Sequence, residues 1–508
     1  MAIKLALLVV FFGIMLAVGI HCRRHATDVN GFVLGGRSVG AWLTAFAYGT
    51  SYFSAVIFVG YAGQFGWRFG VASTWIGLGN AFLGSLLAWV VLGRRTRLMS
   101  QHLDSATMPE FFGKRFGSRG LKIGASIIVF IFLIPYTASL YNGLSRLFGM
   151  AFNIDYTLCI ILMAALTCVY VVAGGYMATA INDFIQGIIM LVGICCVVGA
   201  VLGGQGGFTQ AIISLSQIES ESAATLGQQG AYTSFFGPDL GSLLGVVILT
   251  SLGTWGLPQM VHKFYSIRDE KSIKTGTIIS TLFALVVAGG SYFNGAFGRL
   301  FVESPESVGG YDGIVPAMLG GQLNDLLMGI VIVLVLSASM STLSSLVITS
   351  SSTLTLDLVR DQFRPQMAES RQVLILRVLC AAFIALSVVI AAIPNSLISS
   401  LMSLSWGALG GAFLAPFLYG LFWKGGTRAG VWASFAVGVG YTSLNSVFGW
   451  IAPTTAGAVA MLASMVVFPL VSLATSKLPQ GEVKQIFSCY DAPVTVHQSV
   501  ALEEARDD

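Results

Sequence analysis

Residues 45–55 read AFAYGTSYFSA, a run of small and polar residues in the middle of a long apolar stretch. Residues 250–258, TSLGTWGLP, interrupt a second apolar stretch in the same way. Glycine and proline weaken a helix, and an unwound turn frees carbonyl groups that can replace the water around a cation. The two stretches therefore predict two broken transmembrane helices that take part in binding.

The composition is that of a membrane protein. Of the 508 residues, 55% are hydrophobic and 10% are charged, whereas about a quarter of the residues in a soluble domain are charged. The mean hydropathy is +0.81. Apolar runs of about 20 residues recur, each long enough to cross a bilayer core of roughly 30 Å. We expect the chain to lie in a lipid bilayer and to bind no nucleic acid.

The predicted fold is an all-α integral membrane protein with about 13 transmembrane helices. The two interrupted spans are the second and the seventh, an offset of five that is typical of two inverted repeats of five helices. The alternative for either stretch alone is close packing of small residues, which their matching positions disfavour. The spans lie near residues 3–21, 40–66, 71–93, 121–148, 156–175, 178–203, 239–261, 275–300, 326–356, 374–394, 397–423, 428–450 and 454–476.

These spans divide the chain into six parts. We predict the first transmembrane helix and a cytoplasmic loop at 1–39, the first five-helix repeat at 40–203, an external loop at 204–238, the second five-helix repeat at 239–423, two additional helices at 424–476 and a mobile cytoplasmic tail at 477–508. The loops leave no room for a soluble catalytic domain, and the spans carry no nucleophile with a base. We therefore expect no enzyme.

The distribution of positive charge predicts the orientation. If the amino terminus is outside, only Lys4, Arg68, Arg146 and Arg299 of the 27 Lys and Arg residues lie outside. The carboxyl terminus is then cytoplasmic, and the protein is a multi-pass protein of the plasma (inner) membrane. The basic stretches expected as cytoplasmic loops are 94–122, 263–274 and 360–377.

Hydroxyl groups gather in the ninth span, where residues 337–345 read SASMSTLSS. Helical spacing places Ser341, Ser344 and Ser345 on one face. A single hydroxyl within a membrane helix usually bonds to the preceding turn. So dense a cluster beside broken helices instead predicts oxygen ligands for a cation.

Asp183 is an acidic residue within the sixth span. Burying a lone carboxylate costs about 2.5 to 3.5 kcal/mol on insertion scales, so we expect a cation or strong donors nearby. The alternative is a helix cap close to the cytoplasmic surface. The histidines are expected to be solvated residues of cytoplasmic segments or helix ends, namely His21, His25, His102, His262 and His497.

With these features the sequence resembles the sodium/solute symporter family, whose members move proline, pantothenate, monocarboxylates, sialic acid or sugars. The most specific pieces are LGGRS at 34–38, the glycine pair at 174–175, STLS at 341–344 and WG at 406–407. The resemblance covers all the predicted spans. It implies a sodium-coupled secondary active transporter that imports a small organic solute by alternating access, with sodium as the coupling ion.

The resemblance also implies the site residues. The main sodium ion would be held by the carbonyl groups of Thr50, Phe53 and Ala338 and by the hydroxyl groups of Ser341 and Thr342. A second sodium, present in some relatives, would lie between Asp183 and the serines Ser341, Ser344 and Ser345. The solute pocket would be lined by Ser51, Tyr52, Tyr136, Thr254, Trp255 and Trp406.

The expected class of solute follows from positions at which this chain differs from the proline carriers of the family. Proline carriers place a Trp and a Tyr before the seventh-span proline and an Asp in the broken second span, where this chain has Thr250, Thr254 and Tyr52. These positions look closer to the pantothenate and monocarboxylate branch. We expect a small carboxylate or amino acid, such as pantothenate, a monocarboxylate or proline.

Two other functions stay open. One is a transporter-like sensor that works with a separate output partner, and the other is a proton-coupled carrier. No obligatory protein partner is inferred.

Overall fold

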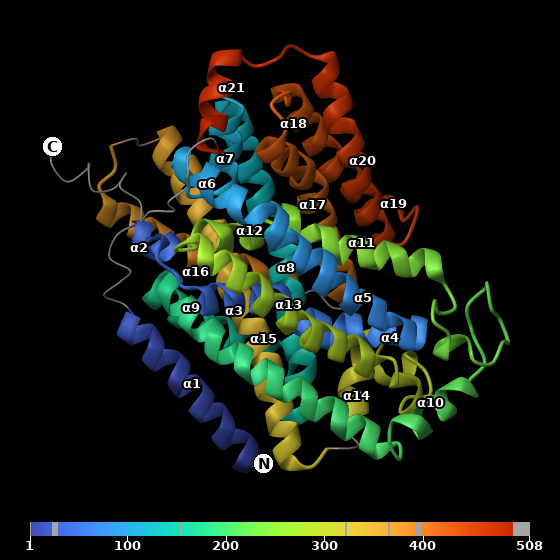
Figure 1. Ribbon diagram of the computed structural model, residues 1–508. Helices are drawn as coiled ribbons and strands as arrows, with labels where there is room; N and C mark the ends of the chain where they lie inside the picture. Colours follow the sequence, from blue (N-terminus) through green and yellow to red (C-terminus); the bar gives the residue numbers. More distant parts are fainter. Residues whose placement is uncertain are drawn as a thin grey trace.

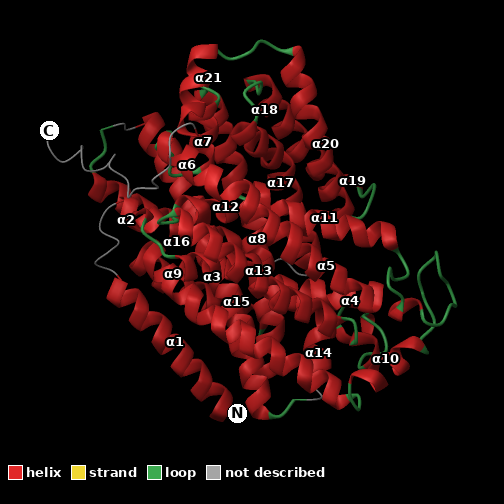
Figure 2. Cartoon of the chain, viewed as in Figure 1, coloured by secondary structure: helices red, strands yellow, loops and turns green. Residues whose placement is uncertain are grey.

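The computed structural model describes residues 2–22, 29–152, 155–320, 323–363, 366–392 and 398–490. Across these ranges the chain consists of helices joined by loops, and no strand is drawn (Figure 2). A helix satisfies its backbone polar groups internally, as the interior of a bilayer requires. The predicted all-α class is therefore confirmed.

Long helices form the body of the molecule (Figure 1). The amino-terminal helix α1 (Ala2–Cys22) packs against α9 (Tyr156–Gly204) and α15 (Asp325–Ser352). The other long helices are α8 (Arg119–Phe152), α13 (Glu270–Gly295), α16 (Glu369–Ala391), α17 (Ile398–Phe422) and α20 (Pro453–Ala474).

Many of these helices can cross a membrane. Among the described residues, nine helical segments are long and apolar enough, or ten if a bent pair is one span. The protein is therefore multi-pass, and the exact number of thirteen stays a prediction.

Helix α9 contains the fifth and sixth predicted spans in one segment. Its 49 residues would extend about 70 Å as a straight helix, more than twice the thickness of a hydrocarbon core. Gly175 interrupts it with a φ of 59° and a ψ of −159°, a conformation that only glycine adopts readily. The chain turns sharply at this residue, where the sequence predicted a short connection.

Both predicted breaks are present. Helix α3 (Ala41–Tyr52) stops at Phe53 and Ser54, and the chain continues in the π-helical turns Val56–Tyr61 and helix α4 (Ala62–Phe69). Helix α11 (Leu240–Gly256) is followed by α12 (Pro258–Tyr265) at an angle of 45°. Pro258 stands at the start of α12, where its missing N–H leaves no hydrogen bond unmade.

The connecting segments contain short helices where the sequence predicted loops. They are α2 (Val29–Leu34), α6 (Arg94–His102), α7 (Met108–Arg115), α10 (Phe208–Ser216), α14 (Ile314–Gly320) and α21 (Gln480–Phe487). The helices α5 (Thr74–Gly79), α18 (Arg428–Phe435) and α19 (Thr442–Phe448) lie within the predicted spans 71–93 and 428–450.

The expected mobile tail is wrong for its first part. Val483 and Phe487 of α21 are buried, and the guanidinium of Arg115 lies 4.8 Å from the centroid of the Phe487 ring. Two apolar residues four apart give a short helix one apolar face, and this face packs against the protein. Residues 491–508 lie outside the described part of the chain.

Candidate sodium and solute site

The broken helix α3 meets α15 through hydroxyl and carbonyl oxygens. The Ser341 hydroxyl donates a hydrogen bond to the Thr50 carbonyl at 2.9 Å, and the Thr342 hydroxyl donates to the same oxygen at 3.2 Å. Both hydroxyls also lie within hydrogen-bonding distance of the Ala338 carbonyl, at 3.0 and 3.1 Å. Four oxygens from two helices therefore converge.

The break in α3 makes this meeting possible. Because α3 ends at Tyr52, the carbonyl of Thr50 is one of the last in the helix and has no helical N–H to accept from. The hydroxyls of α15 take that place. On the far side of the break, the Ala55 N–H donates to the Ser339 hydroxyl at 3.3 Å, so α15 holds both halves of the broken span.

The oxygens are buried and uncharged. Thr50, Ala338, Ser341 and Thr342 have at most 1% of their surface exposed, and so does Phe53, the first residue of the break. Such neutral oxygens at an unwound helix can coordinate sodium in place of water. Four of the five predicted main-site residues are in mutual contact, and Phe53 adjoins them along the chain.

Lys263, which the sequence analysis did not foresee, lies among the residues predicted to bind a second sodium ion. The Lys263 ammonium donates to the Ser345 hydroxyl at 2.9 Å and lies 3.6 Å from a carboxylate oxygen of Asp183. The Ser344 hydroxyl turns back to the Ser341 carbonyl at 2.9 Å. Asp183 thus has the nearby cation that its burial led us to expect, and that cation belongs to the chain.

One expectation about this region is wrong, and one alternative is excluded. Lys263 is not in a cytoplasmic loop but in α12, with 1% of its surface exposed. The alternative that Asp183 caps a helix at the surface is excluded, because seven helical residues lie between the turn at Gly175 and Asp183. The signal that could have located Lys263 is its position five residues after Pro258, within one short half-helix.

His262 also departs from its prediction. Its side chain is buried in α12, with its ring centroid 5.5 Å from that of Tyr176, whereas we expected a solvated residue. The reason is again that α12 runs through the interior. By contrast, His102 contacts the Gln485 carbonyl at 3.0 Å in an exposed position.

Three of the predicted solute residues form an aromatic cluster beside the break in α3. The Tyr52 ring stacks on Phe53, with centroids 4.2 Å apart, and on Trp406, with centroids 6.1 Å apart. The Tyr136 ring meets Trp406 edge-on at 5.9 Å. The Tyr136 hydroxyl and the Trp406 indole N–H are buried without a hydrogen-bond partner among the described residues.

The other three predicted solute residues form hydrogen bonds to residues of other helices. The Ser51 hydroxyl lies 2.8 Å from that of Ser345. The Thr254 hydroxyl and the Trp255 indole N–H donate to the carbonyls of Gly84 and Leu83, each at 3.0 Å. The Tyr52 hydroxyl donates to the carbonyl of Thr250, four residues before Thr254, at 2.6 Å. A common pocket for the six residues stays a prediction.

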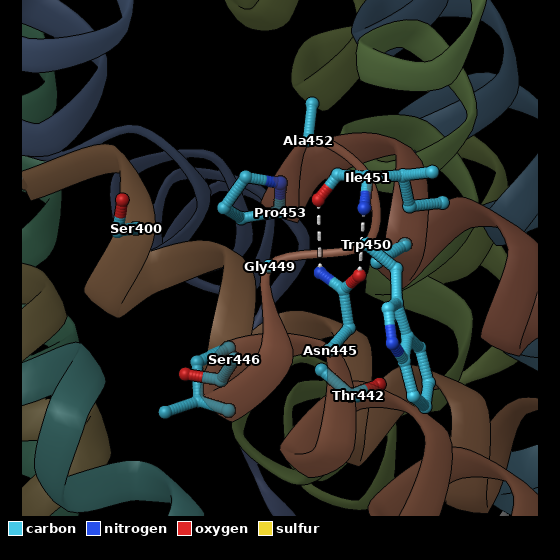
Figure 3. A pocket seen from close by; sticks show the side chains of 11 residues that line it. Ser400, Thr442, Asn445, Ser446, Gly449, Trp450, Ile451, Ala452 and Pro453 are labelled. Atoms are coloured by element: carbon cyan, nitrogen blue, oxygen red, sulfur yellow. Dashed lines mark hydrogen bonds between the residues drawn. The ribbon is translucent and has the colours of Figure 1, made fainter.

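A cavity of about 550 Å³ lies apart from this cluster. Figure 3 shows it between the first turns of α17 and the loop that joins α19 to α20, where the Asn445 side chain bonds to both the N–H and the carbonyl of Ile451. Ser400 and Trp450 are among its lining residues, and none of the predicted sodium or solute residues is.

Helices broken in corresponding positions, with oxygens that converge at one break, are typical of secondary transporters with inverted repeats. The family model "Sodium:solute symporter family" matches residues 32–438. The chain belongs to this family. It is therefore a sodium-coupled symporter of a small organic solute, with sodium as the coupling ion, and it is not an enzyme.

Similar proteins agree with this assignment. The osmoregulated proline transporter OpuE of Bacillus subtilis is 28% identical over 439 residues, which cover 84% of this chain and 86% of the relative. A sodium/proline symporter of Staphylococcus aureus is 29% identical over 442 residues, covering 84% and 82%.

Solved structures are similar in fold. A Na⁺-coupled sialic acid symporter in a substrate-bound outward-open state has a TM-score of 0.77 at 16% identity, and the match covers 94% of this chain and 98% of that one. The nucleobase-cation-symport-1 family transporter Mhp1, in a closed conformation, has a TM-score of 0.51 at 15% identity, covering 90% and 97%.

Proposed function

We propose that the main sodium ion binds where α15 contacts the end of α3, held by Thr50, Phe53, Ala338, Ser341 and Thr342. The observation that carries this proposal is that two hydroxyls of α15 reach the same carbonyl, that of Thr50. When sodium binds, each hydroxyl rotates its hydrogen away and presents an oxygen lone pair to the ion. The two hydroxyls then no longer donate to the Thr50 carbonyl and instead coordinate sodium beside it.

The solute is a small molecule with a carboxylate group. Two buried donors without a partner among the described residues, the Tyr136 hydroxyl and the Trp406 N–H, support this class because a carboxylate only accepts hydrogen bonds. Proline is the first candidate, since two relatives are named for it. A monocarboxylate or pantothenate is the second, because Thr250 and Thr254 replace the residues of proline carriers.

Transport proceeds by alternating access around this site. At one end, the Val39 N–H donates to the Ser266 carbonyl at 3.2 Å and so ties the start of α3 to the end of α12. At the other, the Asp312 carboxylate accepts from the Ile398 N–H at 3.1 Å, at the start of α17. Each hydrogen bond holds one side of the binding site closed, and that side opens when its hydrogen bond breaks.

The amino terminus lies outside and the carboxyl terminus in the cytoplasm of a plasma (inner) membrane. The basic helices α6 and α7 and the helix α21 gather at one end of the molecule, opposite α10 and α14 (Figure 1). This arrangement supports a cytoplasmic position for α6 and α7 by the excess of positive charge. The repeats are proposed to span 40–203 and 239–423.

Purified protein in liposomes tests the function. Uptake of labelled proline, pantothenate, lactate and pyruvate is measured with sodium outside, sodium on both sides, or potassium in place of sodium. We expect one of these solutes to accumulate only with an inward sodium gradient. Accumulation that follows a proton gradient and ignores sodium would contradict the proposed coupling and favour the proton-coupled carrier.

A further inference from the structure

Lys263 lies at the junction of four helices. Its ammonium donates to Ser345 of α15 at 2.9 Å and lies 3.6 Å from Asp183 of α9. The Ser345 hydroxyl in turn lies 2.8 Å from the hydroxyl of Ser51 in α3. The ammonium also lies 5.2 Å from the centroid of the Tyr176 ring, which offers a second favourable contact for a cation.

The ammonium lies between two of the oxygen-bearing groups that a second sodium ion would need. A sodium ion in this place would have to bind the Asp183 carboxylate and the Ser345 hydroxyl. Both groups face the ammonium of Lys263. The lysine thus holds the position of an ion and has the same charge.

The position beside Asp183 and the main sodium site differ in their local charge. Asp183 and Lys263 together carry no net charge, and both are buried. A sodium ion added beside them would place two cations a few ångströms apart where water does not screen them. The main site has only neutral oxygens from Thr50, Ala338, Ser341 and Thr342, so a cation meets no like charge in contact with it.

We propose that Lys263 supplies the second cation from the chain itself, so that this symporter binds and moves one sodium ion per solute molecule. The inference rests on the proposed main sodium site for the position of that one ion. Because the ammonium is tethered to α12, it neutralises Asp183 in every turnover and adds nothing to the dependence on the sodium gradient.

Counting bound ions tests the proposal. Labelled ²²Na⁺ is titrated onto purified full-length protein, and the ratio of sodium to solute flux is measured in proteoliposomes. We expect one ion per wild-type chain. The variant Lys263→Ala exposes the Asp183 carboxylate and leaves space beside it, and we expect it to bind two ions. The double variant Lys263→Ala with Asp183→Asn should return to one.

The matched controls separate this proposal from the main site. Lys263→Arg keeps the charge and should bind one ion. Thr342→Ala, which changes a residue of the main set alone, should weaken binding of the main ion, and adding Lys263→Ala to it should still create the second site. If Thr342→Ala binds its ion as the wild type does while Lys263→Ala still gains one, the main site is wrong and the role of Lys263 stands.

Two results would overturn the role of Lys263. One is a wild-type chain that binds two ions, a count that needs no variant and is unaffected by folding of the mutants. The other is a Lys263→Ala protein that elutes as a single species in detergent and yet binds no additional ion.

Discussion

The hydroxyl of Ser341, in α15, donates a 2.9 Å hydrogen bond to the carbonyl oxygen of Thr50, in the broken helix α3. These residues are 291 positions apart in the chain, and both are buried. Since the carbonyl stands at the end of α3, its partner is free to change without loss of helical bonds. The pair is therefore the point where binding of an ion can act on the relative position of two helices.

Removing both hydroxyls at this junction should abolish sodium dependence. We expect Ser341→Ala with Thr342→Ala to raise the half-saturating sodium concentration by at least about 100-fold, since each lost bond to a charged group costs about 1.5 to 3 kcal/mol. The measurement is initial uptake against sodium concentration. Ser352→Ala is the control, because that hydroxyl bonds within α15 to the Thr349 carbonyl. Unchanged sodium activation in the double variant would exclude this site.

The two unpartnered donors of the aromatic cluster should determine solute affinity. We expect Tyr136→Phe and Trp406→Phe each to raise the KM for the transported solute about tenfold, because each removes one hydrogen bond to a carboxylate. Sodium activation should change less. Tyr141→Phe, five residues further along α8, is the matched control. A KM that is the same in all three variants and wild type would mean that the solute binds elsewhere.

A close contact between α4 and α13 should not tolerate a methyl group. A Cβ atom on Gly66 would lie 2.1 Å from the carbonyl carbon of Gly295, so the two backbones would have to separate. We expect Gly66→Ala to destabilise the protein by roughly 1 to 3 kcal/mol, seen as a lower Tm in detergent. Gly199→Ala, where nothing lies within 4 Å, should leave Tm unchanged or slightly higher. Equal Tm values for the two variants would contradict the packing.

Stability should depend weakly on pH through Glu221. Arg299 donates to its carboxylate at 2.9 Å and holds the pKa of Glu221 below its ordinary value. A lowered pKa in the folded state gives stability that is present above the unfolded pKa, about 4.3, and is lost as the pH falls through the folded pKa. Because the carboxylate is largely exposed, the contribution is below about 1 kcal/mol.

The test of this ion pair compares Glu221→Gln with wild type across pH. We expect the wild type to have a slightly higher Tm at pH 7 and the two curves to converge below about pH 4, where the carboxylate is protonated. Glu219→Gln, two residues away, should follow the wild type. A difference that grows on acidification would have the wrong sign for this pair.

The local sequence was sufficient to predict the broken helices. The breaks at Phe53 and Leu257 lie within 45–55 and 250–258, because glycine, proline and hydroxyl residues act on the turn in which they stand. The all-helical membrane fold followed from composition, because a chain with 10% charged residues must bury its backbone polar groups in helices. Ser341 was recognisable for the same local reason, as one of the hydroxyls clustered in an apolar span, whereas Thr342 was predicted as a ligand from the resemblance to the family.

The surroundings of Asp183 depended on the tertiary structure. Its own sequence context indicated that a cation was needed, but Lys263 lies 80 positions away, beyond the break at Leu257, and reads as the start of a basic loop. Only the 45° bend between α11 and α12 and the packing of α12 against α3 and α15 turn that lysine inward. The sequence indicates that the buried carboxylate of Asp183 needs a cationic partner, whereas the direction of the half-helix α12 determines that Lys263 is that partner.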